Sequence, residues 1–467
     1  MNNVRFLLDD EIVTIDNAQA TASVLDLLRY RLRRTGTKEG CAEGDCGACT
    51  VLLGELDGET IKWRAVNSCI LFVPMLDGKA LRTVESLSPD GALHPVQRAL
   101  VERHGSQCGF CTPGFVMSLY GRSIGSAGTK DEPVADVIAG NLCRCTGYGP
   151  ILDAGEAVPP GEADDSAVVT RLRGIARDGT GSDWFAPRTA DELAALLNAH
   201  PDARIIAGAT DVGLWVTKQH RDLGTVIFIG DVVDLRTIAE DDSGLTIGAG
   251  VRYTEARAAL ARLHPDLGEL VRRIGGLQVR NAGTIGGNIA NGSPIGDMPP
   301  ALIALGATLT LRRGDARRVI PLEDFFIRYG VQDRAPGEFV ESVHVPRPGA
   351  DTIVRIVKLS KRFDSDISAV CGAFAITVEQ GRVTAARIAF GGMAGTPSRA
   401  ASCEAALIGQ DWSEATVEAA AAALANDYTP LTDARGSSDY RSIVAANLLR
   451  RLWAEQSGEP TGVLLDG

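Results

Sequence analysis

The cysteines are the residues of this 467-residue chain whose type and spacing most clearly indicate chemistry. Eight of the ten cysteines lie between Gly40 and Cys145, in two sets of four. The first set is Cys41, Cys46, Cys49 and Cys69, and the second set is Cys108, Cys111, Cys143 and Cys145. Because the thiolate form of cysteine is a strong metal ligand, each set predicts a metal-bound centre.

The spacing within each set indicates the kind of centre. The first set reads Cys-x4-Cys-x2-Cys with a distant fourth cysteine, which is the plant-type [2Fe–2S] spacing. The second set reads Cys-x2-Cys, a long gap and then Cys-x-Cys. Small residues in the first loop leave room for backbone N–H groups to reach the sulfurs, and glycine also permits left-handed backbone angles: Gly40, Ala42, Gly44, Gly47 and Ala48. The pattern therefore predicts two [2Fe–2S] clusters.

Two other uses of cysteine compete with this interpretation. Structural zinc also uses Cys-x2-Cys pairs, although Cys-x4-Cys-x2-Cys and Cys-x-Cys fit a zinc ribbon poorly. Disulfides need an oxidising compartment. Asp9, Asp10 and Glu11 interrupt the apolar start that a secretory signal would require. We therefore expect reduced, metal-bound cysteines in a cytoplasmic protein, with zinc as the open alternative to iron–sulfur.

Two stretches around the second set carry a family resemblance. They are Gln-Cys-Gly-Phe-Cys-Thr-Pro-Gly at 107–114 and Asn-Leu-Cys-Arg-Cys-Thr-Gly-Tyr at 141–148. Together with the order of the two cysteine sets, they resemble the xanthine dehydrogenase/molybdenum hydroxylase family. Within that family the chain is most similar to the small iron–sulfur/FAD subunit of the bacterial enzymes, and the resemblance extends over nearly the whole chain.

Composition limits the classes of partner. The net charge of −12 and the pI near 5.1 argue against a nucleic-acid partner. No apolar run approaches the length of a membrane span, so we expect no membrane partner either. The length predicts three or four domains, and a hydrophobic content of 45% suffices for several cores.

Hydrophobic periodicity predicts the elements that position the first cysteine set. Residues 4–15 alternate as a β-hairpin, and Ser23 is the expected N-cap of the helix that follows. Further strands are predicted over 51–53 and 61–66. A small sheet crossed by one helix, with the cluster at its edge, is a β-grasp ferredoxin, which we assign to residues 1–82.

Helical patterning replaces strands over residues 83–157. Helices are predicted over 94–104, 113–120 and 133–139, with Pro113 and Pro133 at the first turns of the second and third. The resemblance implies a four-helix bundle that holds the second cysteine set. Residues 158–182 are rich in Pro, Gly and Asp, and we predict a linker there.

From residue 183 an α/β pattern predicts a nucleotide site. Thr189-x-x-Glu192 is a capping box. The strand at 204–207 leads through a small-residue turn into a helix that starts at Val212. Such a turn suits a pyrophosphate, because backbone N–H groups and the helix dipole face the anion. A second Gly-rich segment covers 283–297. There is no G-x-G-x-x-G, so a Rossmann site is not indicated, and two ordinary surface turns remain the alternative.

This pair of segments resembles the two-subdomain FAD domain of the vanillyl-alcohol-oxidase/molybdenum-hydroxylase type, here over residues 183–348. The resemblance implies FAD contacts from Ile205, Ile206, Ala207, Gly208, Ala209, Thr210, Asp211, Val212, Ile274, Thr284, Ile285, Gly286, Gly287, Asn288, Asp297, Val340 and Lys358. Among these, Ile274 stands where the family often has an aromatic ring.

Residues 349–460 resemble the C-terminal α+β domain of the same flavoproteins. Strands are predicted over 352–359, 369–377 and 386–390, and helices over 399–408, 415–425 and 440–453. The isolated Cys371 and Cys403 are expected to be buried structural thiols. The expected fold class is therefore a multidomain α+β protein with two [2Fe–2S] domains, an FAD domain and a C-terminal flavoprotein domain.

The resemblance also implies a function. A separate large subunit carries molybdopterin and hydroxylates hypoxanthine or xanthine, within an α2β2 heterotetramer. Electrons pass to the second cysteine set, then to the first set, to FAD and finally to NAD. Gln107 and Cys145 are implied to lie against the pterin. Two alternatives stay open: the equivalent unit of an aldehyde, carbon monoxide or N-heterocycle hydroxylase, and a zinc-stabilised scaffold with no redox role.

Overall fold

The computed structural model describes residues 3–462. The chain divides into two compact units. Unit 1 comprises Met1–Val233, Arg252–Glu255 and Gly275–Thr284, and unit 2 comprises Asp234–Val251, Ala256–Ile274 and Ile285–Gly467. Within residues 3–462, no helix is both long enough and apolar enough to cross a membrane.

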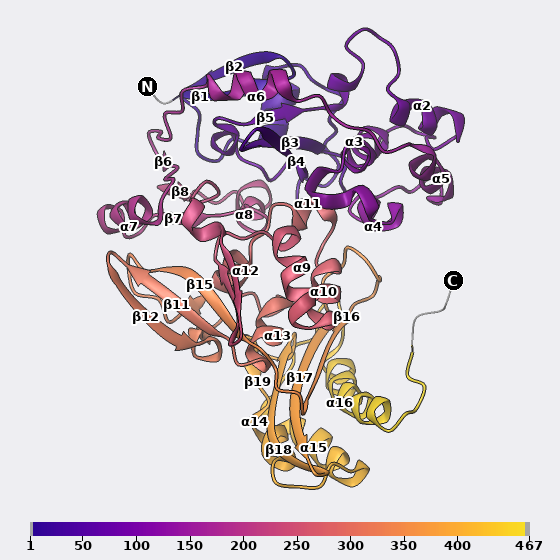
Figure 1. Cartoon of the computed structure of the whole chain (residues 1–467), viewed down its shortest axis with the longest axis vertical. Coiled ribbons are helices and arrows are strands. Elements are labelled where there is room, and N and C mark those ends of the chain that lie inside the picture. The colour runs from indigo at the N-terminus through magenta and orange to yellow at the C-terminus, as the bar shows by residue number, and fades with distance from the viewer. Residues whose placement is uncertain (1–2, 463–467) are drawn as a thin grey trace. The chain divides into compact units, whose positions relative to one another are not determined.

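The first sheet of unit 1 has five strands in the order β2-β1-β5-β3-β4 (Figure 1). The strands are β1 Asn3–Leu8, β2 Glu11–Asp16, β3 Thr50–Asp57, β4 Thr60–Asn67 and β5 Ala80–Arg82. Strands β1 and β2 form the predicted antiparallel hairpin, and β1 pairs with β5 in parallel. Helix α1 (Val24–Asp26) continues as a wider π-helical turn over Leu27–Arg31, and the Asp26 N–H donates to the predicted N-cap Ser23. This is the expected β-grasp ferredoxin fold.

Both faces of this sheet are covered. Leu7 and Leu52 point into one core together with Phe115 and Leu119 of the helical domain. Phe6 and Leu8 point to the opposite side, where they pack with Phe228 and other residues between 184 and 228. These residues belong to the part of unit 1 that is called the flavin-type region below. Because side chains alternate along a strand, one short sheet can join two neighbouring domains.

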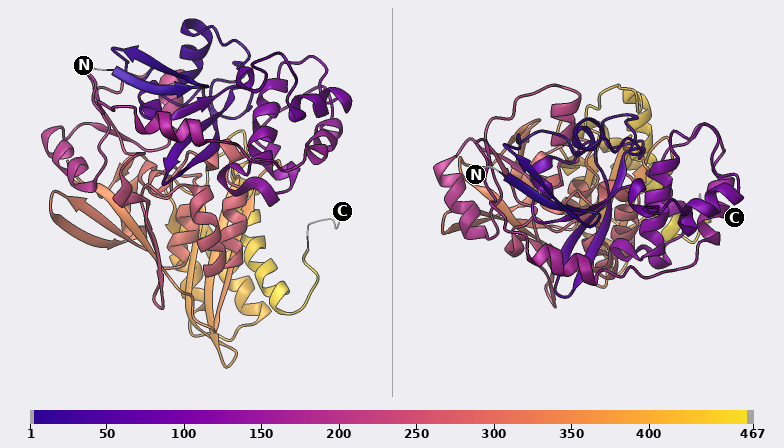
Figure 2. Two further views of the ribbon diagram at one scale, coloured as in Figure 1. Left: turned by 45° about the horizontal axis from the view of Figure 1, so that its top comes forward. Right: turned by 90° about the horizontal axis from the view of Figure 1, so that it is seen from above.

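The helical domain contains four α-helices, which lie beside the sheet in all views (Figures 1 and 2). They are α2 Pro95–Glu102, α3 Thr112–Ser123, α4 Val134–Ile138 and α5 Gly149–Ala157. Pro133 is the N-cap of α4 and so lies one position before its first turn. Shorter 3-10 turns cover Val73–Leu76, Val84–Leu87 and Ser126–Asp131.

The segment expected to be a linker contains a helix. Helix α6 (Ser166–Arg173) buries Val168, Val169 and Leu172 in the core shared by the sheet and the helical domain. The Trp63 indole N–H and Arg82 both donate to Asp165, the residue just before α6. The linker prediction therefore holds only for the Pro- and Gly-rich ends of residues 158–182, on either side of α6.

The remainder of unit 1 is a three-stranded parallel sheet in the order β6-β8-β7, with short helices. Its elements are β6 Trp184–Phe185, α7 Ala190–Ala199, β7 Arg204–Ile206, α8 Val212–Thr217, β8 Val226–Phe228 and α11 Leu277–Arg280. The Thr189 hydroxyl caps α7 by accepting from the Glu192 N–H, as predicted. Helix α9 (Tyr253–Leu263) begins in unit 1 and continues in unit 2 along the sequence.

Unit 2 has one antiparallel five-stranded sheet in the order β12-β11-β15-β10-β9 and one four-stranded sheet in the order β16-β17-β18-β19. The first region contains β9 Ile238–Asp241, β10 Gly244–Gly248, α10 Pro265–Arg272, α12 Ile285–Asn291, α13 Met298–Ala304, β11 Thr308–Arg313, β12 Ala316–Pro321, β13 Phe326–Arg328, β14 Val331–Gln332 and β15 Phe339–Pro346, with a 3-10 turn at Val233–Arg236 and another at Leu322–Phe325.

The C-terminal region is the predicted α+β domain. It contains β16 Thr352–Leu359, β17 Val370–Glu379, β18 Arg382–Gly391, β19 Ser398–Arg399, α14 Ala401–Leu407, α15 Glu414–Asp427 and α16 Ser438–Gln456. Phe374, Ile388 and Phe390 pack against α14, α15 and α16, which lie along one face of the orange strands in Figure 2. Cys371 and Cys403 are buried and free, as expected.

Candidate functional site: two cysteine centres and a flavin-type region

The first cysteine loop directs backbone N–H groups at its own sulfurs. The Cys41 N–H donates to Cys46 Sγ, and the Cys46 N–H donates to Cys41 Sγ, each with an N–S distance of 3.3 Å. Gly44 and Gly47 have φ angles of 78° and 68°, so the loop uses the left-handed region that glycine tolerates. These contacts confirm the expected sulfur–amide pattern, which sets the reduction potential of a bound cluster.

Cys49 and Cys69 complete the first set from the two ends of a hairpin. Cys49 directly precedes β3, and Cys69 follows closely after β4. Their sulfurs lie 3.3 Å apart, and both residues are only 2% exposed. They pack with Leu25, Ile70 and Leu214, so this side of the centre is closed to water.

The second set is held where α3 begins and by the loop before α5. Cys108 Sγ and Cys145 Sγ lie 3.6 Å apart and both residues are exposed. Cys143 is buried; its N–H donates to the Tyr148 hydroxyl, and its sulfur lies 3.3 Å from Thr146 Oγ1. Thr146 and Tyr148 belong to the stretch that carried the family resemblance, but the sequence indicated no contact for either.

The sulfurs approach one another in pairs. Among residues 3–462, no group of three or more His, Cys, Asp or Glu side chains surrounds a single point where one ion could sit. The short sulfur–sulfur distances join Cys49 with Cys69 and Cys108 with Cys145. A [2Fe–2S] core takes two protein ligands on each of its two irons, so paired thiols suit it.

The crowding of the thiols shifts their pKa values. Hydrogen bonding with Cys46 and Cys69 lowers the pKa of Cys41, and the same contacts raise the pKa of its partners. In the second set, burial and the neighbouring Cys143 raise the pKa of Cys111 to about 12. Sulfurs close enough to influence one another's protons are also close enough to share one small inorganic core.

The two cysteine loops contact each other directly. The Leu142 N–H, one residue before Cys143, donates to the Cys46 carbonyl at 3.0 Å. A Cβ on Gly47 would lie 2.3 Å from the Gly140 carbonyl oxygen, and a Cβ on Gly114 would lie 2.2 Å from the Gly47 carbonyl oxygen. The close approach of these backbones therefore requires glycine at both positions.

A buried polar cluster, which the sequence did not indicate, surrounds this contact. The Asn141 amide donates to the Gly47 carbonyl at 3.1 Å and accepts from the Ser118 hydroxyl at 2.7 Å. Gln278, from the flavin-type region of unit 1, donates to Asn141 Oδ1 and Thr50 Oγ1 at 3.0 and 3.1 Å. The three domains of unit 1 therefore meet beside the first cysteine set.

The first predicted flavin loop, Ile205–Val212, runs from β7 into α8 as expected. A Cβ on Gly208 would lie 1.8 Å from the Ala282 carbonyl oxygen and 2.9 Å from the Gly283 nitrogen. The loop therefore lies directly against the start of the second Gly-rich segment within unit 1, which ends at Thr284. Ala209 has a left-handed φ of 58° and is buried.

The second segment differs from the expected turn. Ile285, Gly286, Gly287 and Asn288 form the first part of helix α12. A Cβ on Gly286 would lie 2.4 Å from Ala249 Cβ and 2.7 Å from the Ala249 carbonyl oxygen, within unit 2. The steric demand for glycine here comes from the protein's own backbone, whereas Gly287 is exposed.

The remaining predicted flavin residues lie in unit 2. Asp297 and Lys358 pair with each other, with Lys358 Nζ 2.6 Å from Asp297 Oδ2, and both are buried. Ser368 also donates to Asp297. Val340 is buried in β15, and Ile274 follows α10 and is partly buried. The structure therefore brings two predicted flavin contacts, Asp297 and Lys358, together as a buried ion pair.

Four regions match known protein families. Residues 6–74 match the 2Fe-2S iron-sulfur cluster binding domain, and 83–156 match the [2Fe-2S] binding domain. Residues 178–348 match the FAD binding domain in molybdopterin dehydrogenase, and 355–456 match the CO dehydrogenase flavoprotein C-terminal domain.

A solved structure of carbon monoxide dehydrogenase from Hydrogenophaga pseudoflava, in a form that lacks the Mo-pyranopterin moiety of the molybdenum cofactor, is 31% identical to this chain. The similarity covers 58% of this chain and 94% of that chain, with a TM-score of 0.55. The chain belongs to the molybdenum hydroxylase family. It is an electron-transfer unit of that family, with [2Fe–2S] domains and an FAD domain on one chain.

Curated members of the molybdenum hydroxylase family match over nearly the whole chain. Xanthine dehydrogenase of Emericella nidulans is 30% identical over 97% of this chain, and aldehyde oxidase 2 of Cavia porcellus is 29% identical over 96%. The chain spans 38% and 39% of the length of these two relatives.

Proposed function

We propose that this chain is the iron–sulfur/FAD subunit of a xanthine dehydrogenase. A large partner subunit that binds molybdopterin hydroxylates hypoxanthine and xanthine to urate, and this chain delivers the electrons to NAD. The cofactors would supply the electron-carrying chemistry, and the protein's part is to bind, space and shield them. An α2β2 heterotetramer in the cytoplasm, where thiols stay reduced, is the proposed assembly.

The cysteine sets are the proposed cluster ligands. Cys41, Cys46, Cys49 and Cys69 would bind one [2Fe–2S] cluster, and Cys108, Cys111, Cys143 and Cys145 the other. The proposed FAD contacts are the loop Ile205–Val212, Thr284 to Asn288, Ile274, Asp297, Val340 and Lys358. The close approach of Gly208 to Ala282 supports this proposal, because it places the first loop against the start of the second Gly-rich segment.

The observation that carries the proposal is the hydrogen bond between the two cysteine loops. The Leu142 N–H and the Cys46 carbonyl connect a residue next to one proposed ligand with the backbone of another. Beside this contact, the buried Asn141 side chain donates to the Gly47 carbonyl and accepts from Ser118 and Gln278. Two cysteine centres fixed this closely suit electron transfer between them, whereas two independent structural metal sites would need no such contact.

The second cysteine set has an exposed edge that supports a partner subunit. Cys108, Cys145 and Gln107 are exposed, and Phe110 is 49% exposed. Phe110 is an exposed aromatic side chain beside exposed cysteines, and aromatic residues are enriched at protein interfaces. We therefore propose that the molybdopterin-bearing subunit covers this edge.

Other hydroxylases of the family provide a second candidate function. The structural similarity to carbon monoxide dehydrogenase favours it, but that similarity covers only 58% of this chain. The xanthine dehydrogenase relative covers 97% and therefore includes both cysteine sets and the flavin region together. This difference in coverage disfavours carbon monoxide, but aldehyde oxidase 2 covers 96% of this chain, so the choice between xanthine and an aldehyde needs an assay.

The test is to purify the chain with its native partner and assay hypoxanthine, xanthine, an aldehyde and carbon monoxide, with NAD and with oxygen as acceptors. Purine turnover coupled to NAD reduction is the expected result. Turnover of only a non-purine substrate would select the second candidate. A colourless protein that contains zinc, without flavin absorbance, would identify the non-redox scaffold instead.

A further inference from the structure

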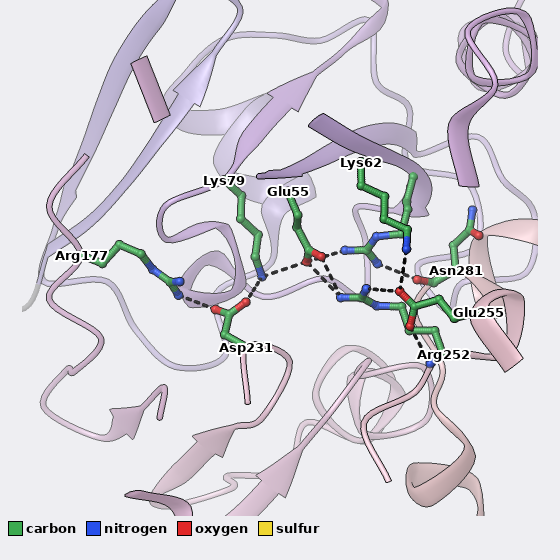
Figure 3. Close-up of polar contacts among 9 residues, drawn as sticks. Glu55, Lys62, Lys79, Arg177, Asp231, Arg252, Glu255 and Asn281 are labelled. Atoms are coloured by element: carbon green, nitrogen blue, oxygen red, sulfur yellow. Dashed lines mark hydrogen bonds and ion pairs between the residues drawn. The ribbon is translucent and has the colours of Figure 1, made fainter. Parts of the chain in front are cut away.

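The carboxylate of Glu55, in β3, is surrounded by three cations inside unit 1 (Figure 3). Arg64 Nη2 lies 2.5 Å away, Arg252 Nη2 contacts both oxygens at 3.0 and 3.2 Å, and Lys79 Nζ lies 3.4 Å away. Glu55 is 8% exposed, and the three cationic residues are also buried. A buried carboxylate needs such compensation, because burial disfavours its charge.

The cations come from two domains. Arg64 and Lys79 belong to the ferredoxin domain, whereas Arg252 lies in the segment that matches the FAD-domain family. Lys79 continues the network to Asp231, also in the FAD-domain part of unit 1, at 3.1 Å, and Arg177 pairs with the same Asp231. Figure 3 shows the side chains of Lys79 and Arg252 pointing toward Glu55, and those of Lys79 and Arg177 pointing toward Asp231.

Two neighbouring hydrogen bonds strengthen this boundary. Arg64 Nη1 donates to the Asn281 carbonyl at 2.7 Å, and the Asn281 amide donates to the Ala65 carbonyl at 2.9 Å. On the outer side, Glu255 lies 3.1 Å from Arg252 and 3.4 Å from Lys62. Strand β4 of the ferredoxin domain is therefore bonded to the FAD-domain part of unit 1 by backbone and side chain together.

The electrostatics favour this closed arrangement. Burial alone would lower the pKa of Arg252, but Glu55 and Glu255 raise it above its ordinary value. Burial would raise the pKa of Asp231, but Lys79 and Arg177 lower it. If the two domains separated, Glu55 would lose the Arg252 nitrogen that contacts both of its oxygens, and Arg252 would lose its buried counter-charge. Removing one partner of a buried ion pair is strongly unfavourable.

The location of the network connects it to the first cysteine set. Glu55 and Arg64 lie on β3 and β4; β3 begins directly after Cys49, and β4 ends two residues before Cys69. A carboxylate that fixes the β3–β4 hairpin to the FAD-domain part of unit 1 thus fixes two of the four thiols of that set. The spacing between an electron donor and its acceptor then depends on this hairpin.

We propose that Glu55 is a positioning residue for electron exchange between the first cysteine centre and the flavin. Its carboxylate holds the β3–β4 hairpin against residues 231, 252–255 and 275–284. One electron leaves one centre and one arrives at the other, with no bond made or broken at Glu55. This role rests on the proposed function, since it requires a cluster and a flavin in the same chain.

The experiment compares three variants of the cofactor-loaded chain in its complex. Glu55→Gln keeps the shape of the side chain and removes the charge, and Glu55→Asp keeps the charge on a shorter side chain. Lys79→Met removes the cation that joins Glu55 to Asp231 and leaves Arg64 and Arg252 in contact with Glu55. The matched control is Glu404→Gln, because Glu404 is also buried and pairs with Arg399 inside the C-terminal domain.

Two readouts separate positioning from general stability. Hydrogen exchange is measured in peptides that cover β3, β4 and residues 275–284. A photoexcited deazaflavin delivers single electrons, and their redistribution between flavin and cluster is followed by absorbance. We expect Glu55→Gln to keep full iron and flavin content, to exchange faster in these peptides and to redistribute electrons severalfold more slowly. Glu55→Asp should recover most of the rate, and Lys79→Met should lie between.

Wild-type exchange and wild-type electron redistribution in both Glu55→Gln and Lys79→Met would overturn the proposal. Equal slowing in Glu404→Gln would also overturn it, because the effect would then be global destabilisation. If Glu55→Gln does not fold, the Lys79→Met and Glu55→Asp variants decide by the same two readouts. Because a sacrificial donor supplies the electrons through the photoexcited deazaflavin, an enzyme that ignores NAD or xanthine would contradict the proposed function and leave this test intact.

Discussion

At the scale of single residues, Cys46 connects the first cysteine loop to the second. Its N–H and sulfur both bond to Cys41, and its carbonyl accepts from Leu142. We expect Cys46→Ser to lose one [2Fe–2S] signal, about half of the iron, and to keep the second cluster and FAD. Iron analysis and electron paramagnetic resonance on the same sample measure this.

The control for that variant is Cys403→Ala, which removes a buried thiol of α14 in unit 2 and should leave both signals unchanged. Two intact clusters in Cys46→Ser would contradict the ligand assignment. Loss of both clusters and the flavin would show that the domains of unit 1 do not fold independently.

Gly208 is a second residue whose replacement has a defined consequence. An added Cβ would lie 1.8 Å from the Ala282 carbonyl oxygen, so Gly208→Ala must push two backbone segments apart. Overpacking of this kind costs about 1–3 kcal/mol or more. We expect loss of flavin from the purified variant, with iron content unchanged, measured by absorbance and iron analysis.

Gly395→Ala is the matched control, since a Cβ there meets no described atom within 4 Å and the residue has no left-handed φ. Full flavin occupancy in Gly208→Ala would show that the loop relaxes without affecting its ligand, and the flavin-loop assignment would lose its geometric support.

At the scale of elements, the sequence predicted what local spacing determines. The cysteine sets, the hairpin of β1 and β2 and the strand–turn–helix at 204–217 all depend on neighbours along the chain. Helix α6 was missed because its three buried residues are embedded in a Pro/Gly-rich segment. The buried ion pair of Glu55 could not be predicted from the sequence. Its partner Arg252 lies 197 residues away, and no local periodicity indicates such a pair.

Glu338, just before β15, allows a pH test of one element. Arg318 in β12 donates to both Glu338 oxygens, at 2.7 and 2.8 Å, and this contact lowers the pKa of Glu338. Since the folded pKa is below the ordinary value of about 4.3, the pair stabilises the fold above that pH and loses its effect as pH falls through the lowered pKa. Glu338→Gln should cost about 1–2 kcal/mol at pH 7.

The measurement is the urea midpoint of wild type and Glu338→Gln between pH 7 and the acid limit of folding. The difference between them should close below the ordinary glutamate pKa. Glu418→Gln, which breaks an exposed pair with Arg450, should change little at any pH because solvent screens it. A constant difference across the pH range would mean that packing, and not charge, sets the cost for Glu338.

At the scale of the whole molecule, the four family matches comprise two [2Fe–2S] domains, an FAD binding domain and a flavoprotein C-terminal domain. We expect the isolated chain, loaded with clusters and FAD, to oxidise NADH with an artificial acceptor and to leave xanthine unchanged. The assay is spectrophotometric, with the Gly208→Ala variant as a flavin-deficient control. Urate formation without an added partner would refute the division of labour.

If the first cysteine set binds the proposed cluster, iron must reach it before that part of the chain closes. Cys49 and Cys69 are 2% exposed beneath Leu25, Ile70 and Leu214, whereas Cys108 and Cys145 are exposed. An assembly factor that donates iron and sulfide to the folded apo-chain would therefore fill the second set quickly and the first set only after local unfolding. Cluster insertion in the cell should thus accompany synthesis and folding, and the first centre, once lost, should be the harder one to replace.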